Sequence, residues 1–252
     1  MSLPAAPNKT IPSSTKQGDD GWPVYALQTG LNAVSFSSGG ADGAFGPMTD
    51  KAVRSFQDKY NLVVDGIAGS ATQRRISILI DAETHSNHDS LPVGLLRGFA
   101  ESEGGNNLGA VNWSVGGGVD CGVVQIRCYG PPFEQSAMKN AYDPAKAMEK
   151  VAVTFLGRTA SMRTMAYAKQ RSLEFAMRCA ALAWNWPYAA EQYAKFGSLG
   201  SSAGNNATWA VIGGNRVKFS DGAPVMTWQD WCQFYALGGK HGEGRVTRFV
   251  EW

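Results

Sequence analysis

The sequence predicts a mainly helical protein with two domains, a small three-helix domain followed by a larger domain of α+β structure. Three observations lead to this prediction. Apolar residues recur at helical spacing in most segments, a short Asp-Gly motif occurs twice near the N-terminus, and a polar stretch separates the two regions. We therefore expect a disordered tail over residues 1–18, a first domain over 19–80, a linker over 81–90 and a second domain over 91–252.

Composition and charge exclude several classes of protein. The chain has 252 residues, of which 44% are hydrophobic and 17% are charged, and its net charge of +2 is too small to indicate a nucleic-acid partner. The four cysteines form no CxxC pair, so they indicate neither a zinc ribbon nor a disulfide framework. No segment is apolar over the length of a membrane helix, and the first residues have no signal peptide, so we expect synthesis in the cytoplasm and no membrane insertion.

Two polar segments lie outside the predicted domains. Residues 1–18 are rich in Pro, Ser, Thr and Lys and have no apolar periodicity, which predicts a tail. Residues 81–90 lack apolar anchors, which predicts a linker. We interpret His85 and His88 as solvated linker residues, because no Cys or further His lies nearby to complete a metal site.

A repeated motif characterises the first domain. The segment Asp42-Gly-Ala-Phe-Gly-Pro-Met-Thr49 recurs as Asp65-Gly-Ile-Ala-Gly-Ser-Ala-Thr72. Asp-Gly supplies the positive φ that a tight turn needs, so each copy predicts a turn that leads into a helix. Apolar residues at helical spacing flank both copies and predict three short helices around one core: Val24, Leu27 and Leu31, then Val53, Phe56 and Tyr60.

This region resembles the peptidoglycan-binding domain 1 family over about residues 19–80. The resemblance implies a three-helix bundle that binds bacterial peptidoglycan. Without it, the repeat and the spacing show only a small helical domain. The residues that carry the resemblance are Gln28, Asp42, Gly43, Phe45, Gly46, Thr49, Phe56, Gln57, Asp65, Gly66, Gly69 and Thr72.

Helical spacing continues in the second domain. Leu91, Leu95 and Phe99 predict a helix that ends at Gly104-Gly105, and Asp143-Pro144 predicts the start of another helix. Between them, the apolar run over residues 119–126 is either a strand or a buried turn, because its periodicity does not distinguish the two.

Glu101 lies near the end of the first of these helices. Core packing would hold its backbone there while its side chain faces a cleft. Glycoside cleavage needs a carboxylic acid in a partly apolar site to protonate the leaving oxygen. On spacing alone, Glu101 and Glu103 could equally be solvated residues at a helix end.

The motifs around Glu101 resemble the lysozyme-like superfamily of lytic transglycosylases and goose-type lysozymes. In that superfamily an ES pair precedes a GLMQI-like segment, and here Glu101-Ser102 precedes Gly122-Val-Val-Gln125-Ile126 in the same order. Ala183-Trp184-Asn185 is similar to a third, AYN-like motif of the superfamily. The resemblance implies that Glu101 is the general acid and that Ser102, Gln125, Trp184 and Asn185 lie at the substrate site. Val-Val replaces the usual Leu-Met, and Trp-Pro follows Asn185 where Ala-Gly is common.

Asp120 is the candidate second carboxylate, which would position water for hydrolysis. The resemblance also includes transglycosylases, which lack such a base and let the sugar's own 6-hydroxyl close an anhydro ring. An equal alternative for Asp120 is a turn aspartate that accepts hydrogen bonds from nearby backbone N–H groups.

A competing interpretation starts from Asp120-Cys121-Gly122, which is similar to the nucleophile segment of NlpC/P60 cysteine peptidases. Such an enzyme would cut peptide rather than glycan. Its thiolate would need a histidine base within hydrogen-bond reach, and the second domain's only histidine is His241, close to the C-terminus.

These observations predict a muramidase that cleaves the β-1,4 bond between N-acetylmuramic acid and N-acetylglucosamine, by hydrolysis or by lytic transglycosylation, with peptidoglycan as its partner and without metal or cofactor. The domain order and the missing signal peptide resemble a bacteriophage endolysin, made in the host cytoplasm and released to the cell wall at lysis, and we expect a monomer. The alternative hypothesis, from another class of protein, is a non-catalytic wall-binding or virion structural protein.

Overall fold

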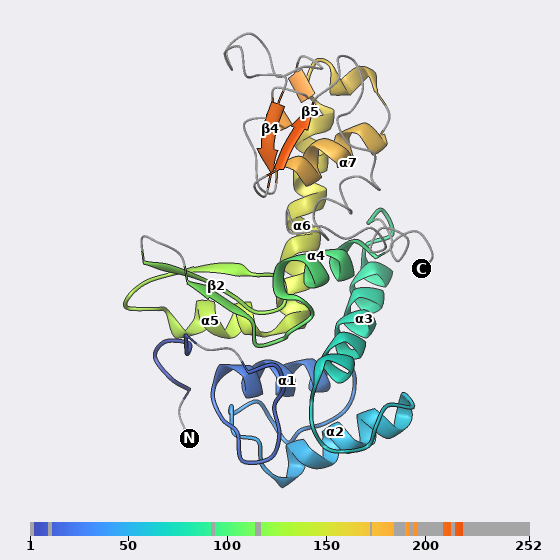
Figure 1. The fold of residues 1–252 in the computed structure, drawn as a ribbon. Coiled ribbons are helices and arrows are strands. Elements are labelled where there is room, and N and C mark those ends of the chain that lie inside the picture. The colour runs from blue at the N-terminus through green and yellow to red at the C-terminus, as the bar shows by residue number, and fades with distance from the viewer. Residues whose placement is uncertain are drawn as a thin grey trace. The chain divides into compact units, whose positions relative to one another are not determined.

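The computed structural model describes residues 3–9, 12–91, 94–113, 117–171, 173–183, 190–191, 194–195, 209–212 and 215–218. The chain divides into two compact units, residues 1–151 and residues 152–252. Figure 1 shows the helices and strands in chain order. Among the helices of these described residues, none is long and apolar enough to cross a membrane.

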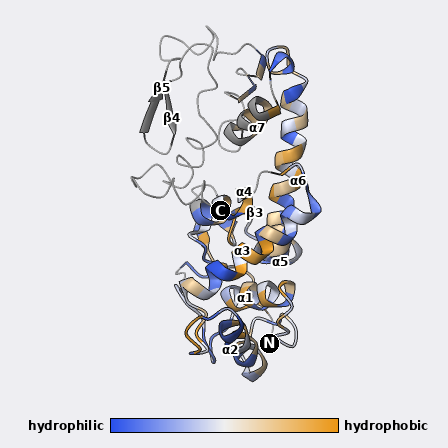
Figure 2. Ribbon diagram, turned by 90° about the vertical axis from the view of Figure 1, so that its right-hand side faces the viewer, coloured by the Kyte–Doolittle hydropathy of each residue, from blue (hydrophilic) through white to orange (hydrophobic). Residues whose placement is uncertain are grey.

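Three helices build the N-terminal part of the first unit: α1 (Trp22–Ala33), α2 (Pro47–Lys59) and α3 (Ser70–Asn87). A glycine directly precedes each helix, and in α1 and α2 a proline occupies the first turn, where no backbone N–H needs an intrahelical partner. Figure 2 shows hydrophobic and hydrophilic residues along α1, and most residues of this helix are buried. The apolar faces share one core, which includes Trp22, Leu27, Leu31, Phe56, Ile76 and Ile80. The predicted three-helix region is confirmed.

Part of the predicted tail pairs with the first domain. The N–H of Thr15 donates to the carbonyl oxygen of Ala68 (3.3 Å), and the N–H of Ala68 donates to the carbonyl oxygen of Thr15 (2.8 Å). The prediction of a disordered tail over residues 1–18 is therefore wrong around Thr15. Backbone pairing needs no apolar periodicity in the sequence, so the composition of this segment did not indicate it.

The predicted linker over residues 81–90 is mostly helical. Helix α3 continues to Asn87, and Asp81 and Thr84 are buried. The helix contains no Gly or Pro, and Ile76, Ile80 and Thr84 follow one another at four-residue spacing on one buried face. The linker prediction is wrong for residues 81–87, because this polar surface packs against other residues of the unit.

A helix, a small sheet and a second helix complete the first unit. Helix α4 (Leu95–Gly104) packs against α3 and is followed by three antiparallel strands, β1 (Val111–Trp113), β2 (Gly118–Cys121) and β3 (Ile126–Tyr129), in the order β1-β2-β3. The run over residues 119–126 thus forms the end of a strand, a turn and the start of the next strand. Helix α5 (Gln135–Tyr142) contacts β2, β3 and α1.

Helix α6 (Pro144–Arg163) begins in the first unit and ends in the second. The second unit also contains the 3-10 helix η1 (Ala168–Gln170), α7 (Leu173–Leu182) and an antiparallel pair, β4 (Trp209–Ile212) and β5 (Asn215–Lys218). Its described core consists mainly of small side chains, among them Ala168, Ala176, Cys179 and Ala183. The described residues are rich in helix with two small sheets, which agrees with the mainly α prediction, while the lysozyme-like topology stays a prediction.

Candidate functional site

The first Asp-Gly loop is held by one buried glutamine on α1. The Nε2 atom of Gln28 lies 2.9 Å from Asp42 Oδ1, 3.0 Å from the carbonyl oxygen of Ala44 and 3.1 Å from Thr49 Oγ1. Its Oε1 atom accepts a hydrogen bond from the N–H of Gly43 at 2.8 Å. Both polar atoms of the Gln28 side chain therefore form hydrogen bonds that hold the loop in place.

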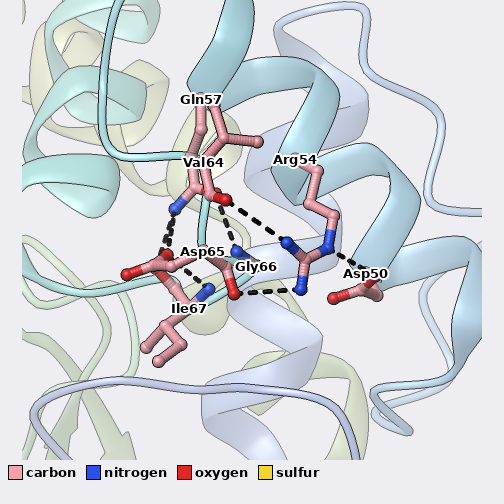
Figure 3. A network of polar contacts seen from close by, with 7 residues as sticks. All are labelled: Asp50, Arg54, Gln57, Val64, Asp65, Gly66 and Ile67. Atoms are coloured by element: carbon pink, nitrogen blue, oxygen red, sulfur yellow. Dashed lines mark hydrogen bonds and ion pairs between the residues drawn. The ribbon is translucent and has the colours of Figure 1, made fainter.

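The second loop repeats this arrangement (Figure 3). The Nε2 atom of Gln57 on α2 lies 2.9 Å from Asp65 Oδ1 and 3.0 Å from the carbonyl oxygen of Ile67. The same atom lies 3.3 Å from Thr72 Oγ1. The N–H of Gly66 donates to Gln57 Oε1 at 3.0 Å. The sequence repeat is thus a repeat of one hydrogen-bond network, which explains why Gln, Asp, Gly and Thr recur together.

Arg54 adds a second support to this loop. Its guanidinium donates to the carbonyl oxygens of Val64 (3.3 Å) and Asp65 (3.0 Å), and its Nε donates to Asp50 Oδ2 at 2.9 Å. Figure 3 shows Arg54 and Gln57 approaching the same turn from α2. The backbone of this loop is therefore held by two side chains of the preceding helix.

Both loop aspartates favour the ionised form. The pKa of Asp42 is lowered by a hydrogen bond from the N–H of Ala44 and by the amide of Gln28. The pKa of Asp65 is lowered in the same way by the N–H of Ile67 and the amide of Gln57. Each turn is therefore built around a charged acceptor.

Other motif residues are buried or directly precede a helix. Phe45 and Phe56 are buried, and Gly46 and Gly69 directly precede α2 and α3. These motif residues thus have a structural role in the loops. The exposed large apolar side chains of this region belong to other residues: Met48, Val63, Val64 and Ile67. Sequence reasoning missed these exposed residues; the only signal was an aliphatic pair, Val63-Val64, directly before a turn.

The structure joins the helix of Glu101 to the turn of Gln125. Glu101 is partly exposed on α4, and Gly104 ends this helix. A Cβ atom on Gly104 would lie 2.5 Å from the carbonyl oxygen of Val123, so the end of α4 abuts the turn between β2 and β3. The first two motifs of the lysozyme-like resemblance, separated in sequence, are adjacent in the fold.

The turn itself has an unusual backbone. Gly122 and Gln125 both have positive φ, 76° and 52°, and the side-chain amide of Gln125 donates to the carbonyl oxygen of Gly122 at 2.8 Å. A side chain at Gly122 would collide with the carbonyl oxygen of Ala141 on α5. Glycine is therefore required at this position for two reasons, and Gln125 remains partly exposed at the end of the turn.

Asp120 forms an ion pair across the sheet. It lies opposite Arg127 in the register of β2 and β3, with Arg127 Nε 2.6 Å from Oδ1 and Nη2 3.0 Å from Oδ2. Burial raises the pKa of Asp120, and the charge of Arg127 opposes that shift. The alternative of a turn aspartate bound to backbone N–H groups is wrong, because Asp120 lies in a strand and binds a guanidinium.

Cys121 is fully buried beside Cys128. Interaction with Cys128 and burial both raise the pKa of Cys121. A nucleophilic cysteine needs a lowered pKa and access to substrate. This environment therefore disfavours Cys121 as a nucleophile.

Several predicted site residues lie outside what the structure describes. Trp184, Asn185 and His241 belong to segments that it does not describe. Ser102 lies on α4, next to Glu101. Glu103, on the same helix, is partly buried. The structure therefore brings together the segments of Glu101 and Gln125, while the roles of all these residues stay predictions.

Comparison with known proteins identifies the first region. The family model of the peptidoglycan binding domain (PG_binding_1) matches residues 21–76. These residues are a peptidoglycan-binding domain. All the motif residues of the two loops lie inside the matched segment, whereas Glu101, Asp120 and Gln125 lie beyond it. Peptidoglycan is the partner that this domain indicates.

Curated relatives of the chain include cell-wall lytic enzymes. The chain is 41% identical over 61 residues to a spore cortex-lytic enzyme of Bacillus cereus (24% of each chain) and 38% identical over 74 residues to the N-acetylmuramoyl-L-alanine amidase CwlL of Bacillus licheniformis (29% of this chain, 21% of the relative). It is 32% identical over 136 residues to a zinc D-Ala-D-Ala carboxypeptidase of Streptomyces albus G (52% and 48%). These matches span less than half the length of each relative.

Proposed function

We propose that this protein binds peptidoglycan through residues 21–76 and cleaves the β-1,4 bond between N-acetylmuramic acid and N-acetylglucosamine, with Glu101 as the general acid. The observation that supports this most is the close approach of Gly104 to Val123, because it joins the helix of Glu101 to the turn of Gln125. Homology to cell-wall lytic enzymes supports the coarser statement that the protein degrades the cell wall.

Glu101 would donate its proton to the glycosidic oxygen as the C–O bond breaks. Hydrolysis also needs a base that activates water. Asp120 is the candidate, and Arg127 lies within hydrogen-bond distance of both its carboxylate oxygens, so Asp120 would act with its charge partly neutralised. Lytic transglycosylation needs no second carboxylate, because the 6-hydroxyl of the sugar attacks.

The test is mass spectrometry of the soluble fragments that wild-type protein, Glu101→Gln and Glu103→Gln release from purified peptidoglycan. We expect Glu101→Gln to slow release by about 10²–10⁴-fold, since general acid catalysis contributes about that much. Glu103→Gln, two residues along the same helix, is the matched control and should stay close to wild type. Anhydromuramic ends would indicate transglycosylation, and reducing muramic ends would indicate hydrolysis. Unchanged release by Glu101→Gln would show that the assigned acid is wrong.

A second candidate is cleavage of an amide bond in the peptide stem, which the names of the amidase and carboxypeptidase relatives favour. The same digestion distinguishes it. New amino groups without new glycan ends would contradict the proposed muramidase, and Cys121→Ser would then show whether the thiol is involved. Sedimentation with peptidoglycan without any released fragment would indicate a binding-only protein and would also contradict the proposal.

A further inference from the structure

The three-stranded sheet has a packed inner face and an outer face that meets solvent, because side chains alternate between the two faces along each strand. Val119, Cys121 and Cys128 are buried on the inner face. Helix α5 contacts β2 and β3, and its Tyr142 interacts with Cys121, so α5 covers this face (Figure 1). The alternate positions of the strands therefore form the outer face.

Strand register places polar and aromatic side chains on the outer face in two neighbouring rows. Asn112, Asp120 and Arg127 lie opposite one another across the three strands. In the next row, Gly118 lies opposite Tyr129. Tyr129 is 81% exposed, and Asn112 and Arg127 are exposed as well. Two residues along a strand span roughly 7 Å, so Tyr129 lies about one sugar unit from the row of Asp120.

The side chain of Arg127 joins the two rows. Its Nε and Nη2 atoms bind the carboxylate of Asp120, at 2.6 Å and 3.0 Å. A Cβ atom on Gly118 would lie 2.9 Å from Arg127 Nη1, so this amino group lies over the glycine, in the row of Tyr129. A guanidinium has five N–H donors, and the pair with Asp120 uses those of Nε and Nη2. Nη1 can therefore donate to a ligand that rests on Tyr129.

The chemistry of this face fits a sugar better than a peptide stem. The C–H groups of a sugar ring can stack on an exposed aromatic ring, and a guanidinium can donate to hydroxyl and acetamide oxygens. Among the residues of the three strands, only Asp120 and Arg127 are charged, and they neutralise each other. A glycan strand is rich in hydroxyl and acetamide groups. A peptide stem carries carboxylate and ammonium groups, which would need unpaired charges on the protein.

We propose that Tyr129 and Arg127 form a subsite for one N-acetylated sugar of the glycan strand, which stacks on Tyr129 and accepts a hydrogen bond from Arg127 Nη1. The inference rests on the proposed function and deepens it, since Asp120, the candidate base, lies on the same face. Tyr129 binds a sugar next to the reaction centre and takes no part in proton transfer. A side chain at residue 118 would displace Arg127, so Gly118 keeps the guanidinium beside Tyr129.

The experiment measures KM and kcat of the full chain on glycan strands freed of peptide stems, and the Kd for the β-1,4-linked N-acetylglucosamine tetramer by calorimetry. Tyr129→Ala should raise KM and Kd about five- to tenfold, the size of one aromatic contact, and leave kcat close to wild type. Tyr129→Phe keeps the ring and should stay close to wild type. Val153→Ala is the matched control, because Val153 is 54% exposed on α6, outside the sheet and the binding domain. Any binding through residues 21–76 is common to all these variants.

Three outcomes would overturn the inference. The first is a Tyr129→Ala variant with the KM and Kd of wild type, and the second is a loss confined to kcat. The third is a loss seen only with peptidoglycan that keeps its peptide stems, which would assign this face to the stem. Failure of the proposed function is a separate result, because wild type would then release no glycan fragments. In that case the Kd for the tetramer still decides, and an equal Kd for wild type and Tyr129→Ala overturns the inference.

Discussion

At the scale of single residues, two buried glutamines hold the two Asp-Gly loops of the first domain. Gln28 and Gln57 are both 1% exposed, and each carboxamide contacts an aspartate, a backbone carbonyl, a threonine and a glycine N–H. Buried polar groups stabilise a fold only when their partners are present, since an unsatisfied buried group costs about 1–3 kcal/mol. Each glutamine thus fixes one loop.

Gln57→Ala should lower the free energy of unfolding by about 2–3 kcal/mol, because it leaves the N–H of Gly66 and the hydroxyl of Thr72 without this partner. Urea unfolding followed by tryptophan fluorescence measures the change. Gln135→Ala is the matched control: Gln135 is exposed and donates one hydrogen bond, to the carbonyl oxygen of Pro4. Equal effects of the two substitutions would contradict the role of the buried network.

At the scale of elements, the contact between the end of α4 and the turn over residues 122–125 positions the candidate acid. It depends on Gly104, since a methyl group there would press on the backbone of Val123. Backbone atoms cannot rotate away as a flexible side chain can, so the helix or the turn would have to move. A displaced helix end would also displace Glu101.

Gly104→Ala should destabilise the protein by about 1–3 kcal/mol through overpacking, although alanine favours helix by about 1 kcal/mol. Gly157→Ala is the control, because Gly157 lies within α6 with no atom near its added Cβ. That substitution should stabilise the protein by up to about 1 kcal/mol. Thermal unfolding of both variants gives the comparison, and a stabilised Gly104→Ala would disprove the close contact.

At the scale of the whole first unit, the peptidoglycan-binding domain shares its core with the residues that follow it. Trp22 stacks on Tyr142 with ring centroids 5.1 Å apart, and the N–H of Leu108 donates to Gln73 Oε1 at 2.8 Å. Added methyl groups at Gly30 or Gly109 would press on Pro144 or Pro23. Residues 1–151 therefore form one unit, in which the binding domain and the start of the second region support each other.

Tyr142→Ala should lower the free energy of unfolding by about 3–5 kcal/mol, since it removes a fully buried aromatic ring beside Trp22. Tyr129→Ala removes a ring that is 81% exposed and should change stability by less than about 0.5 kcal/mol. Urea unfolding monitored by tryptophan fluorescence tests both. If Tyr142→Ala unfolds like wild type, the first region does not depend on the residues after α4.

Sequence reasoning found the local features of this protein and missed contacts between distant segments. The Asp-Gly repeat identified both loops, and Asp143-Pro144 marked the start of α6, where the N–H of Lys146 donates to Asp143 Oδ1 at 3.2 Å. The polar composition of residues 81–87 hid a helix, in which the buried Asp81 accepts a hydrogen bond from the backbone N–H of Arg97 on α4. Asp120 belonged to a strand, and only strand register revealed Arg127 as its partner.

By itself, the sequence determined where α2, α3 and α6 begin, the two loops and their glutamines, and the peptidoglycan-binding domain, because turns and helix starts depend on residues close together in the chain. Only the tertiary structure decided that Asp81 meets Arg97, that Gly104 meets Val123 and that Cys121 is buried. These contacts join residues far apart in the sequence, and their free energy depends on packing and exclusion of water, which no local pattern records.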